Sequence, residues 1–432
     1  MDRQWPHALG PPVLVELAYG TEGRQVDVPE DATVIEPVDL PGLADQPGVV
    51  RWALERPLSG PSLSELATGA HRVAVVFPDL TRPMPNRTVL PPVLALLERS
   101  GVPDEAVTLL CATGTHRRAT PGEMRELVGP EIVGRYTIVD HDADGGDHVE
   151  VGRVDGAPIL LQRDYVEADV RIITGFVEPH FFAGFSGGPK AVCPGIAATE
   201  TILEAHHPRR IADGASTFVT RQGNPVHDFV RAAVALAPPH LSLDVAINRA
   251  RQVTAVFAGP LLEAHDAACA FVGASAVQRV ASPFDVVVST NGGHPLDRNL
   301  YQAVKGMAAA ERIVRRGGII VMAAACGDGI PGDGGFARLL SRARTADDLV
   351  DAAGGAELDR WQAQVLGRVV QRAQVWLYSE GMTDQMTTDA FLFPVHDLAT
   401  VVDNALAALG GSGTVAVLPL GPLTVATAST AE

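Results

Sequence analysis

The segment "FDVVVSTNGGHPLDRNLYQAVKGMAAAERIVRRGGIIVMAAAC", residues 284–326, decides the fold. It opens with a short apolar run and continues through a Gly-rich loop into a long helical pattern. It ends in a second apolar run, "IIVMAAAC", at residues 319–326. A strand, a crossover helix and a second strand form a βαβ unit, whose two strands are parallel. We therefore expect an α/β fold around this segment.

The same order of elements recurs nearer the N-terminus. "RVAVVFPDLTRPMPN" begins with a predicted strand at 72–77, and "AVTLLCATGTH" begins with one at 106–111. In the helical pattern after the second strand, Thr120 can cap the helix and Glu123, three residues on, completes a capping box. Continuous apolar strands of this kind favour a buried parallel sheet. Further predicted elements are a helix in 356–373, a strand in 374–381, a helix in 399–410 and a final strand in 413–421.

The length of 432 residues exceeds one ordinary hydrophobic core and predicts two domains. We expect a boundary near 275–283, with an N-terminal α/β domain over 1–280 and a C-terminal α/β domain over 281–410. Both are expected to hold largely parallel, Rossmann-like sheets, with residues 411–432 packing back onto the first domain. Ligands of such folds collect at the carboxyl ends of the strands, so an active-site cleft between the domains is expected.

The charge and composition of the chain indicate which binding partners it disfavours. The net charge of −17 at pH 7 makes nucleic acid and anionic membrane unfavourable partners. The N-terminus lacks the basic and apolar regions of a secretion signal, and the longest apolar runs fall short of the roughly 18 residues of a membrane span. A cytoplasmic location is therefore expected. The four cysteines are widely spaced, which is typical of reduced thiols rather than of a disulfide framework or zinc site.

Polar side chains gather in the loops that follow the predicted strands. Polar residues populate loops in any protein, so one such residue alone carries little weight. Together they point to a single cleft, because the carboxyl ends of parallel strands meet at one edge of a sheet. These residues are Asp79, Arg82, His116, His141, Asp142, Glu178, His180 and His294.

The segment "GFSGGPKAVCPG", residues 184–195, contains Lys190, one of only two lysines in the chain. It differs from a Walker phosphate loop because Pro189 precedes the lysine and Ala191 follows it. Its glycines still allow the backbone to approach a ligand closely, and its N–H groups could hold a phosphate. A buried lysine, unlike an arginine, can lose its proton and become a nucleophile that forms a Schiff base, amide or thioamide. The alternatives are a chance survivor of an arginine-rich composition or a simple salt bridge.

The second lysine, Lys305, lies at the start of the helix predicted in the βαβ unit, with Gln302 one turn earlier on the same face. This pair suits a small carboxylate or hydroxyl ligand, although a solvated helix face would look the same. His206 and His207 stand in "TILEAHHPRR", and the sequence has no compact metal-binding signature. Taken alone, a histidine of this kind is more often a hydrogen-bonded structural group.

Together these stretches resemble the lactate racemase family, whose members use a nickel-pincer nucleotide. The resemblance runs in order through most of the chain, and the family fold is two α/β domains that close over the active site. The matching segments are "DLTRPMPN" (79–86), "TGTHR" (113–117), "HDA" (141–143), "GFVEPHFFAGFSGGPKAVCPGIAATETILEAHH" (175–207) and "GGHPLDRNLYQAVKG" (292–306).

The resemblance implies a role for each matching residue. It implies that Lys190 is joined through a thioamide to the nickel-pincer nucleotide (nickel pyridinium-3,5-bisthiocarboxylic acid mononucleotide). It also implies that His206 completes the coordination of the nickel, with His207 as the close alternative. The remaining implied roles are acid and base for His116 and His180, contact with cofactor and substrate for Asp79 and Arg82, and contact with substrate for Gln302 and Lys305.

The implied activity is racemisation or epimerisation at C2 of a 2-hydroxy acid. A hydride passes from C2 to the cofactor and returns to the opposite face, while one histidine removes the hydroxyl proton and the other restores it. Arg82 and Lys305 neutralise the carboxylate of the small anionic substrate. Proteins that make the cofactor are the implied partners.

Two positions depart from the family pattern. Pro189 stands where many members have a basic residue, so one contact to the cofactor phosphate is expected to differ. His294 stands where an aromatic residue is more usual, which is expected to change the substrate tail that fits. Lactate, malate, longer aliphatic or aromatic hydroxy acids and aldonic acids all stay open as substrates.

Two other classes of protein compete with this interpretation. A divergent binding protein, or another enzyme, could keep the α/β fold without the cofactor. A histidine-based metallohydrolase is disfavoured because its motif is absent. The presence together of Lys190, His116, His180, His206, Arg82 and Lys305 favours the racemase.

Overall fold

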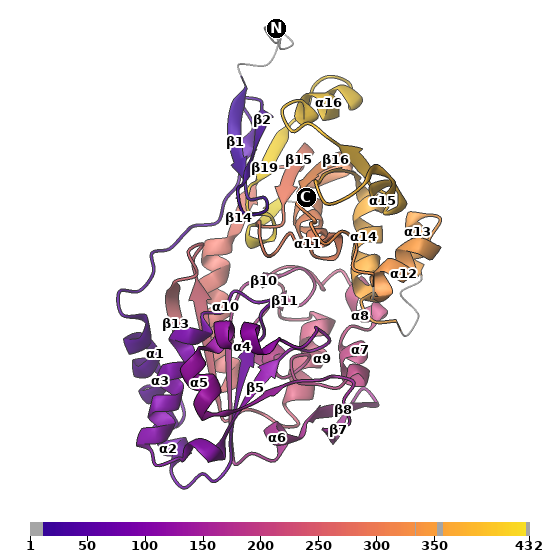
Figure 1. The fold of residues 1–432 in the computed structure, drawn as a ribbon. Helices are drawn as coiled ribbons and strands as arrows, with labels where there is room; N and C mark the ends of the chain where they lie inside the picture. Colours follow the sequence, from indigo (N-terminus) through magenta and orange to yellow (C-terminus); the bar gives the residue numbers. More distant parts are fainter. Residues whose placement is uncertain (1–11, 333, 352–356, 429–432) are drawn as a thin grey trace. The chain divides into compact units, whose positions relative to one another are not determined.

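The computed structural model describes residues 12–332, 334–351 and 357–428. The chain divides into two compact units. The central unit is Asp39–Ser275, and the terminal unit joins Met1–Val38 to Ala276–Glu432. Within each unit, helices flank a parallel-dominated sheet (Figure 1). The α/β fold with two sheets agrees with the prediction from sequence.

The sheet of the central unit has six strands in the order β13-β12-β9-β4-β5-β6. Neighbours from β12 to β6 are parallel, and β13 at the edge runs antiparallel to β12. The turn between β12 and β13 closes through Asn248 N–H donating to the Gln252 carbonyl, a connection too short for a parallel crossover. The strands are β4 (Val73–Pro78), β5 (Val107–Ala112), β6 (Thr137–Asp140), β9 (Val170–Phe176), β12 (Leu241–Ile247) and β13 (Val253–Gly259).

The helices of the central unit pack their apolar faces onto this sheet. Figure 1 shows α1 and α3 side by side, and the core beneath includes Leu97, Leu109 and Leu243. The predicted capping box is confirmed: Thr120 Oγ1 accepts from the Glu123 N–H, and Glu123 Oε2 accepts from the Thr120 N–H. The helices are α1 (Gln46–Glu55), α2 (Leu63–Ala67), α3 (Asn86–Arg99), α4 (Pro121–Val128), α5 (Pro130–Arg135), α6 (Arg163–Val166), α7 (Thr199–Ala205), α8 (Pro208–Ala212), α9 (Pro225–Val234) and α10 (Leu261–Ala276).

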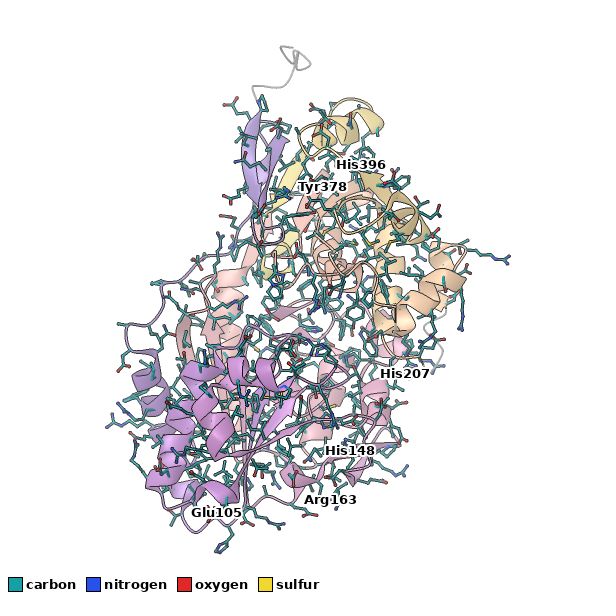
Figure 2. The ribbon with its side chains drawn as sticks, in the orientation of Figure 1. Glu105, His148, Arg163, His207, Tyr378 and His396 are labelled. Atoms are coloured by element: carbon teal, nitrogen blue, oxygen red, sulfur yellow. The ribbon has the colours of Figure 1, made fainter. Side chains whose placement is uncertain are left out.

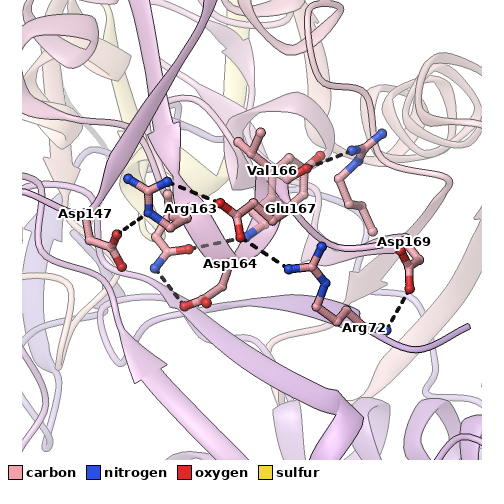
Figure 3. Close-up of polar contacts among 10 residues, drawn as sticks. Arg72, Asp147, Arg163, Asp164, Val166, Glu167 and Asp169 are labelled. Atoms are coloured by element: carbon pink, nitrogen blue, oxygen red, sulfur yellow. Dashed lines mark hydrogen bonds and ion pairs between the residues drawn. The ribbon is translucent and has the colours of Figure 1, made fainter.

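Charged side chains hold the amino ends of β4 and β9 together (Figure 3). The backbone N–H of Arg72 donates to Asp169 over 2.9 Å, and the Arg72 guanidinium lies 3.3 Å from Glu167. Arg163 bonds both Glu167 and Asp147. Exposed ion pairs of this kind stabilise weakly, and they lie at the end of the sheet where β4 and β9 begin. The opposite, carboxyl edge of the sheet is left to the loops that carry the polar residues.

Two short antiparallel hairpins interrupt the α/β pattern of the central unit. Only the strands of the α/β pattern were predicted from the sequence, and these hairpins lie outside the main sheet. They are β7 (His148–Val154) with β8 (Ala157–Gln162), and β10 (Pro179–His180) with β11 (Gly184–Phe185). The second hairpin is followed by the 3₁₀ helix η2 (Gly188–Ala191).

The terminal unit has its own six-stranded sheet, in the order β18-β17-β16-β15-β19-β3, in which every neighbouring pair is parallel. The βαβ unit predicted from residues 284–326 is confirmed as β15, α11 and β16, although β16 begins at Val314, earlier than the predicted run. The strands are β3 (Thr33–Val34), β15 (Phe284–Thr290), β16 (Val314–Ala323), β17 (Gln374–Tyr378), β18 (Phe393–Val395) and β19 (Val415–Leu418).

The other elements of the terminal unit cover this sheet or extend from it. The hairpin of β1 and β2 contributes Leu17 and Val26 to the core that β15 and β16 build. Strand β14 pairs in parallel with β20 near the end of the chain. The elements are β1 (Val13–Leu17), β2 (Arg24–Val28), β14 (Val277–Val280), β20 (Val425–Ala428), and the helices α11 (Leu300–Glu311), α12 (Gly335–Arg342), α13 (Ala346–Asp351), α14 (Arg360–Arg372), α15 (Asp384–Asp389) and α16 (Val401–Ala408).

This division differs from the expected domains at both ends of the chain. Residues up to Val38 were expected in the first domain, but β3 pairs with β19 and so belongs to the terminal unit. Residues 411–432 were expected to pack back onto the first domain. Strand β19 lies inside the terminal sheet, while β20 pairs with β14, whose residues 277–280 fall within the expected first domain. The expected boundary near 275–283 agrees with the start of the terminal unit at Ala276. Among the described residues, no helix is long and apolar enough to cross a membrane.

Candidate active site

Asp79 and His116 come together at the carboxyl edge of the central sheet. Asp79 follows β4 and is buried, and its Oδ2 lies 2.9 Å from Nδ1 of His116, which follows β5. Burial raises the pKa of Asp79, but the charge and hydrogen bond of His116 and the charge of Arg82 outweigh that effect and leave the pKa lowered. Asp79 is therefore an ionised acceptor. Because a carboxylate only accepts, Nδ1 of His116 carries a proton and the lone pair of a neutral ring lies on Nε2.

Thr81, which the sequence analysis did not single out, links Asp79 to Arg82. Its hydroxyl donates to Asp79 Oδ1 over 2.9 Å and accepts from Nη1 of Arg82 over 3.1 Å. The same oxygen lies 3.3 Å from Nδ1 of His116. The motif "DLTRP" therefore brings Asp79, Thr81 and Arg82 into one hydrogen-bonded group. The hydroxyl between two charged residues of one motif was the available sequence signal.

His180 belongs to the small hairpin that follows β9. Its Nδ1 accepts from the backbone N–H of Ala183 over 3.2 Å, and its ring stacks on Phe181 and meets Phe182 edge-on. Because Nδ1 is the accepting atom, a neutral His180 ring carries its proton on Nε2. His116 and His180 are thus held in opposite tautomers. In the sheet, β5 and β9 lie on the two sides of β4.

Three of the candidate residues contact the ring of Phe182. Its ring centroid is 4.5 Å from that of His180 and 5.4 Å from that of His206, and Nζ of Lys190 lies 5.6 Å from it. An ammonium near an aromatic face is attracted by the ring quadrupole. In the sequence, Phe182 stood out only as part of a longer motif. Its place shows that the segments around Lys190 and His206 pack against one ring.

Lys190 lies on η2, directly after a turn made by Gly187 and Gly188. Both glycines have left-handed backbones, with φ of +75° and +48°. The Lys190 N–H donates to the Gly187 carbonyl, and the Lys190 carbonyl accepts from the N–H of Gly195. The Gly195 carbonyl in turn accepts from the N–H of Gly114, in the loop that carries His116, over 2.9 Å. One backbone chain of hydrogen bonds therefore joins the lysine loop to the His116 loop.

His206 and His207 have different surroundings. His206 ends α7, is buried, and donates from Nδ1 to the Ile202 carbonyl over 2.8 Å, which places the lone pair of the neutral ring on Nε2. His207 begins α8, where Nδ1 accepts from the Arg209 N–H (Figure 2). The imidazole of His206 faces Phe182, whereas His207 caps a helix.

Four further sequence candidates have structural partners. Buried His141 donates from Nε2 to the Ala197 carbonyl over 2.9 Å, and burial lowers its pKa to about 4. Asp142 pairs with Arg118 at the surface. In the terminal unit, the backbone N–H of His294 donates to the Gly20 carbonyl. Glu178, also a candidate, is fixed through its N–H to Ser186 Oγ.

Gln302 and Lys305 lie on the first turns of α11 in the terminal unit. Asn299 caps this helix and accepts from the Gln302 N–H over 3.0 Å. Asn291, just after β15, accepts from the Gly306 N–H, which fixes the helix at the carboxyl end of its strand. The i, i+3 spacing puts both side chains on one helix face, as expected.

A metal ion held by the protein alone requires several ligating side chains close together. Within the residues that the structure describes, no group of three or more histidine, cysteine, aspartate and glutamate side chains could hold one.

Most of the chain is similar to lactate racemases. The lactate racemase N-terminal domain matches residues 19–217, and the lactate racemase C-terminal domain matches residues 279–425. The lactate racemase of Thermoanaerobacterium thermosaccharolyticum is 32% identical over 425 residues, covering 94% of this chain and 97% of that protein. The lactate racemase of Lactiplantibacillus plantarum is 34% identical over 379 residues, covering 86% and 89%.

Solved structures give the same result. The lactate racemase apoprotein from Thermoanaerobacterium thermosaccharolyticum matches with a TM-score of 0.89 at 32% identity, covering 96% of this chain and 100% of that one. A structural-genomics target from Thermotoga maritima matches with a TM-score of 0.68 at 17% identity, covering 91% and 100%, which shows a common fold alone.

These relatives and the α/β fold define the protein as an isomerase. The chain belongs to the lactate racemase family, as the resemblance of its sequence motifs predicted.

Proposed function

We propose that this protein inverts C2 of a small 2-hydroxy acid, with His116 and His180 as its base and acid. The observation that carries the proposal is their opposite hydrogen bonding. Nδ1–H of His116 donates to Asp79, so Nε2 offers a lone pair that can take a proton, whereas Nδ1 of His180 accepts, so Nε2–H of the neutral ring offers a hydrogen bond to the substrate oxygen. Because β5 and β9 flank β4, their ends are separated by two strand spacings, roughly 10 Å, which is room for a small substrate.

The residues around Phe182 fit the nickel-pincer nucleotide of the family. Lys190 offers an amine, and His206 offers an imidazole whose lone pair on Nε2 suits a metal. The chain otherwise has no protein cluster for a metal within its described residues, which suits a cofactor that brings its own ligands. When bound, such a cofactor supplies a reversible acceptor for the hydride of C2.

The side chains of the protein then transfer the protons and bind the substrate carboxylate. The Nε2 lone pair of His116 takes the hydroxyl proton, and ionised Asp79 stabilises the imidazolium that results. The 2-keto acid is planar at C2, so return of the hydride to its other face inverts the centre. The proton that goes back to the oxygen comes from Nε2 of His180 when that ring is an imidazolium, so that a neutral ring is left. Arg82 uses one N–H on Thr81, which leaves other donors of its fork for the substrate carboxylate. We assign Gln302 and Lys305 to the same substrate from the terminal unit.

Lactate is the first substrate to test, because both curated relatives carry that name. The protein should be produced together with proteins that make the cofactor, and the Lys190 peptide examined by mass spectrometry. A panel of single enantiomers of lactate, malate, longer hydroxy acids and aldonic acids is then followed by chiral chromatography. Loss of optical purity with a mass adduct on Lys190 is expected.

The matched control is Lys190→Arg, which keeps the charge but not the nucleophilic amine. We expect no adduct and no racemisation from this variant. Wild-type protein that stays unmodified and nickel-free under these conditions would contradict the proposal. If that unmodified protein still bound a 2-hydroxy acid without turning it over, the cofactor-free binding protein would be the better description.

A further inference from the structure

A carboxylate lies buried directly beneath the turn that carries Lys190. Asp244, on β12, is 1% exposed, and its Oδ1 accepts from the Gly188 N–H over 2.9 Å. Its Oδ2 accepts from the hydroxyl of Ser242 over 3.1 Å. The Gly188 N–H is the first of η2, and no side chain of the turn itself caps it. Asp244 therefore supplies the acceptor that the lysine-bearing turn lacks.

A histidine holds the same turn from α10. Nε2 of His265 donates to the Ser186 carbonyl over 3.0 Å. A Cβ added to Gly188 would lie 2.4 Å from Cγ of His265, and one added to Gly187 would lie 2.9 Å from Oδ1 of Asp244. The turn is thus in contact with the Asp244 carboxylate and the His265 ring. Glycine is required because any larger residue would collide with one of them.

The polar carboxyl group of Asp244 makes a purely packing role a poor explanation. Burial raises the pKa of Asp244, and the charge of His265 and the bonds from Gly188 and Ser242 only partly oppose that effect. A buried carboxyl group is costly unless its oxygens are bonded, and an apolar residue would fill this space without that cost. The neighbouring Leu243 shows the contrast, since it points into the apolar core on the other face of the strand.

We infer that Asp244 and His265 are positioning residues that fix the Ser186–Gly188 backbone, so that Lys190, two residues on, is presented in one orientation for cofactor attachment. Neither residue touches the reacting atoms in this assignment. The attachment itself rests on the proposed function, whereas the order of the turn does not. The two parts are therefore measured separately.

The test compares Asp244→Ala with Asp244→Asn and with Leu243→Ala. Asparagine keeps an oxygen for the Gly188 N–H and can donate to the Ser242 hydroxyl, so it should behave as the wild type. Leu243→Ala opens a cavity in the core on the opposite face and is the control for a general loss of stability. Melting temperature is recorded for every variant.

The first readout is hydrogen exchange of the 184–193 peptide in cofactor-free protein. Asp244→Ala should exchange the amides of this turn about tenfold faster, the size expected for one lost buried hydrogen bond, while the two other variants keep wild-type protection there. The second readout is the fraction of Lys190 that carries the cofactor after production with the cofactor-making proteins. Asp244→Ala should fall about tenfold and Asp244→Asn should be rescued.

Equal exchange and equal attachment in Asp244→Ala and wild type would overturn the inference. So would a loss of attachment in Leu243→Ala as large as that in Asp244→Ala at the same melting temperature. If Asp244→Ala does not fold, His265→Phe keeps a ring and removes the bond to Ser186 together with the contact to Cys269 Sγ, and it must show the same local exchange. Absence of any adduct on wild-type Lys190 would count against the proposed function, and the exchange readout would still decide the role of Asp244.

Discussion

Nδ1 of His116 lies 2.9 Å from Oδ2 of Asp79, and the other oxygen of that carboxylate is held by the hydroxyl of Thr81. The carboxylate is buried while the imidazole is about one-third exposed, so the ring is oriented from its buried side. This arrangement fixes which nitrogen of His116 faces outward. It also places a negative charge where a protonated ring needs it.

Asp79→Asn should keep the size of the side chain and remove its charge. The amide still offers one oxygen to Nδ1 of His116 but no longer stabilises the imidazolium. We expect kcat to fall by about 10² or more in both directions, with KM changed much less. Steady-state kinetics by chiral chromatography checks this, and the mass of the Lys190 peptide should show normal loading. An unchanged kcat would contradict the role of Asp79.

Thr81→Val removes the hydroxyl group and keeps the shape of the side chain, so it tests the two hydrogen bonds of Thr81 alone. Valine leaves Asp79 Oδ1 without its donor and Arg82 without its acceptor, and we expect kcat/KM to fall about tenfold. Thr81→Ser retains the hydroxyl and should recover most of the activity. Equal losses in the serine and valine variants would show that the methyl group, rather than the hydrogen bonds, is what matters.

Phe182→Leu should loosen the packing shared by His180, His206 and Lys190. The leucine keeps apolar volume but removes the aromatic face and edge that these groups contact. We expect a lower nickel content and a lower fraction of modified Lys190, measured by elemental analysis and peptide mass. Phe229→Leu is the matched control, because Phe229 is equally buried and carries the Arg210 guanidinium 4.4 Å from its ring. The same loss of nickel in both variants would exclude a specific role for Phe182.

Acid should destabilise the protein through its buried histidines. Burial lowers the pKa of His227 to about 3 and that of His141 to about 4, below the ordinary 6.5. Between 6.5 and these values the unfolded chain binds protons that the folded chain does not, so stability is complete above pH 6.5 and falls as the pH drops. Each histidine should cost about 2 kcal/mol of unfolding free energy between pH 7.5 and pH 5.

Urea unfolding of His227→Phe at both pH values tests this. The phenyl ring cannot titrate, so the loss of unfolding free energy on acidification should shrink by about 2 kcal/mol. His396→Gln is the control, because the His396 side chain is exposed (Figure 2) and its removal should leave the difference between the two pH values unchanged. A pH dependence in His227→Phe as steep as that of the wild type would refute the assignment.

The strong periodic segments of the fold could be predicted from the sequence, and the weak ones could not. The run at 284–326 has two apolar strands around one helix, and the structure confirms them as β15, α11 and β16. Strand β3 has only two residues, Thr33 and Val34, so its pairing with β19 left no pattern in the sequence. The place of residues 33–34 in the terminal unit could not be predicted for that reason, because such a strand is stabilised by its neighbour rather than by its own residues.

The candidate active site, too, could be predicted only in part from the sequence. Asp79, Arg82 and His116 were expected at strand ends, and the structure joins them. Thr81 and Phe182 were not predicted as site residues, because hydroxyl and phenyl groups are common in loops. Only their contacts in the structure distinguish them from other such residues. Asp244 had a signal that was not used: a lone charged residue in the apolar run "LSLDVAI", 241–247. A charge in a buried strand implies partners, but the sequence alone does not say which ones.

The central unit is one continuous stretch of chain, Asp39–Ser275, inserted between the two pieces that build the terminal unit. Two junctions in the gene therefore suffice to exchange it. Such an exchange would move Asp79, His116, His180, Lys190 and His206 as a set, while α11 with Gln302 and Lys305 stays behind. Recombination between relatives would in this way pair one central unit with many forms of α11, and the hydroxy acids that such hybrids accept would test the substrate contacts proposed for that helix.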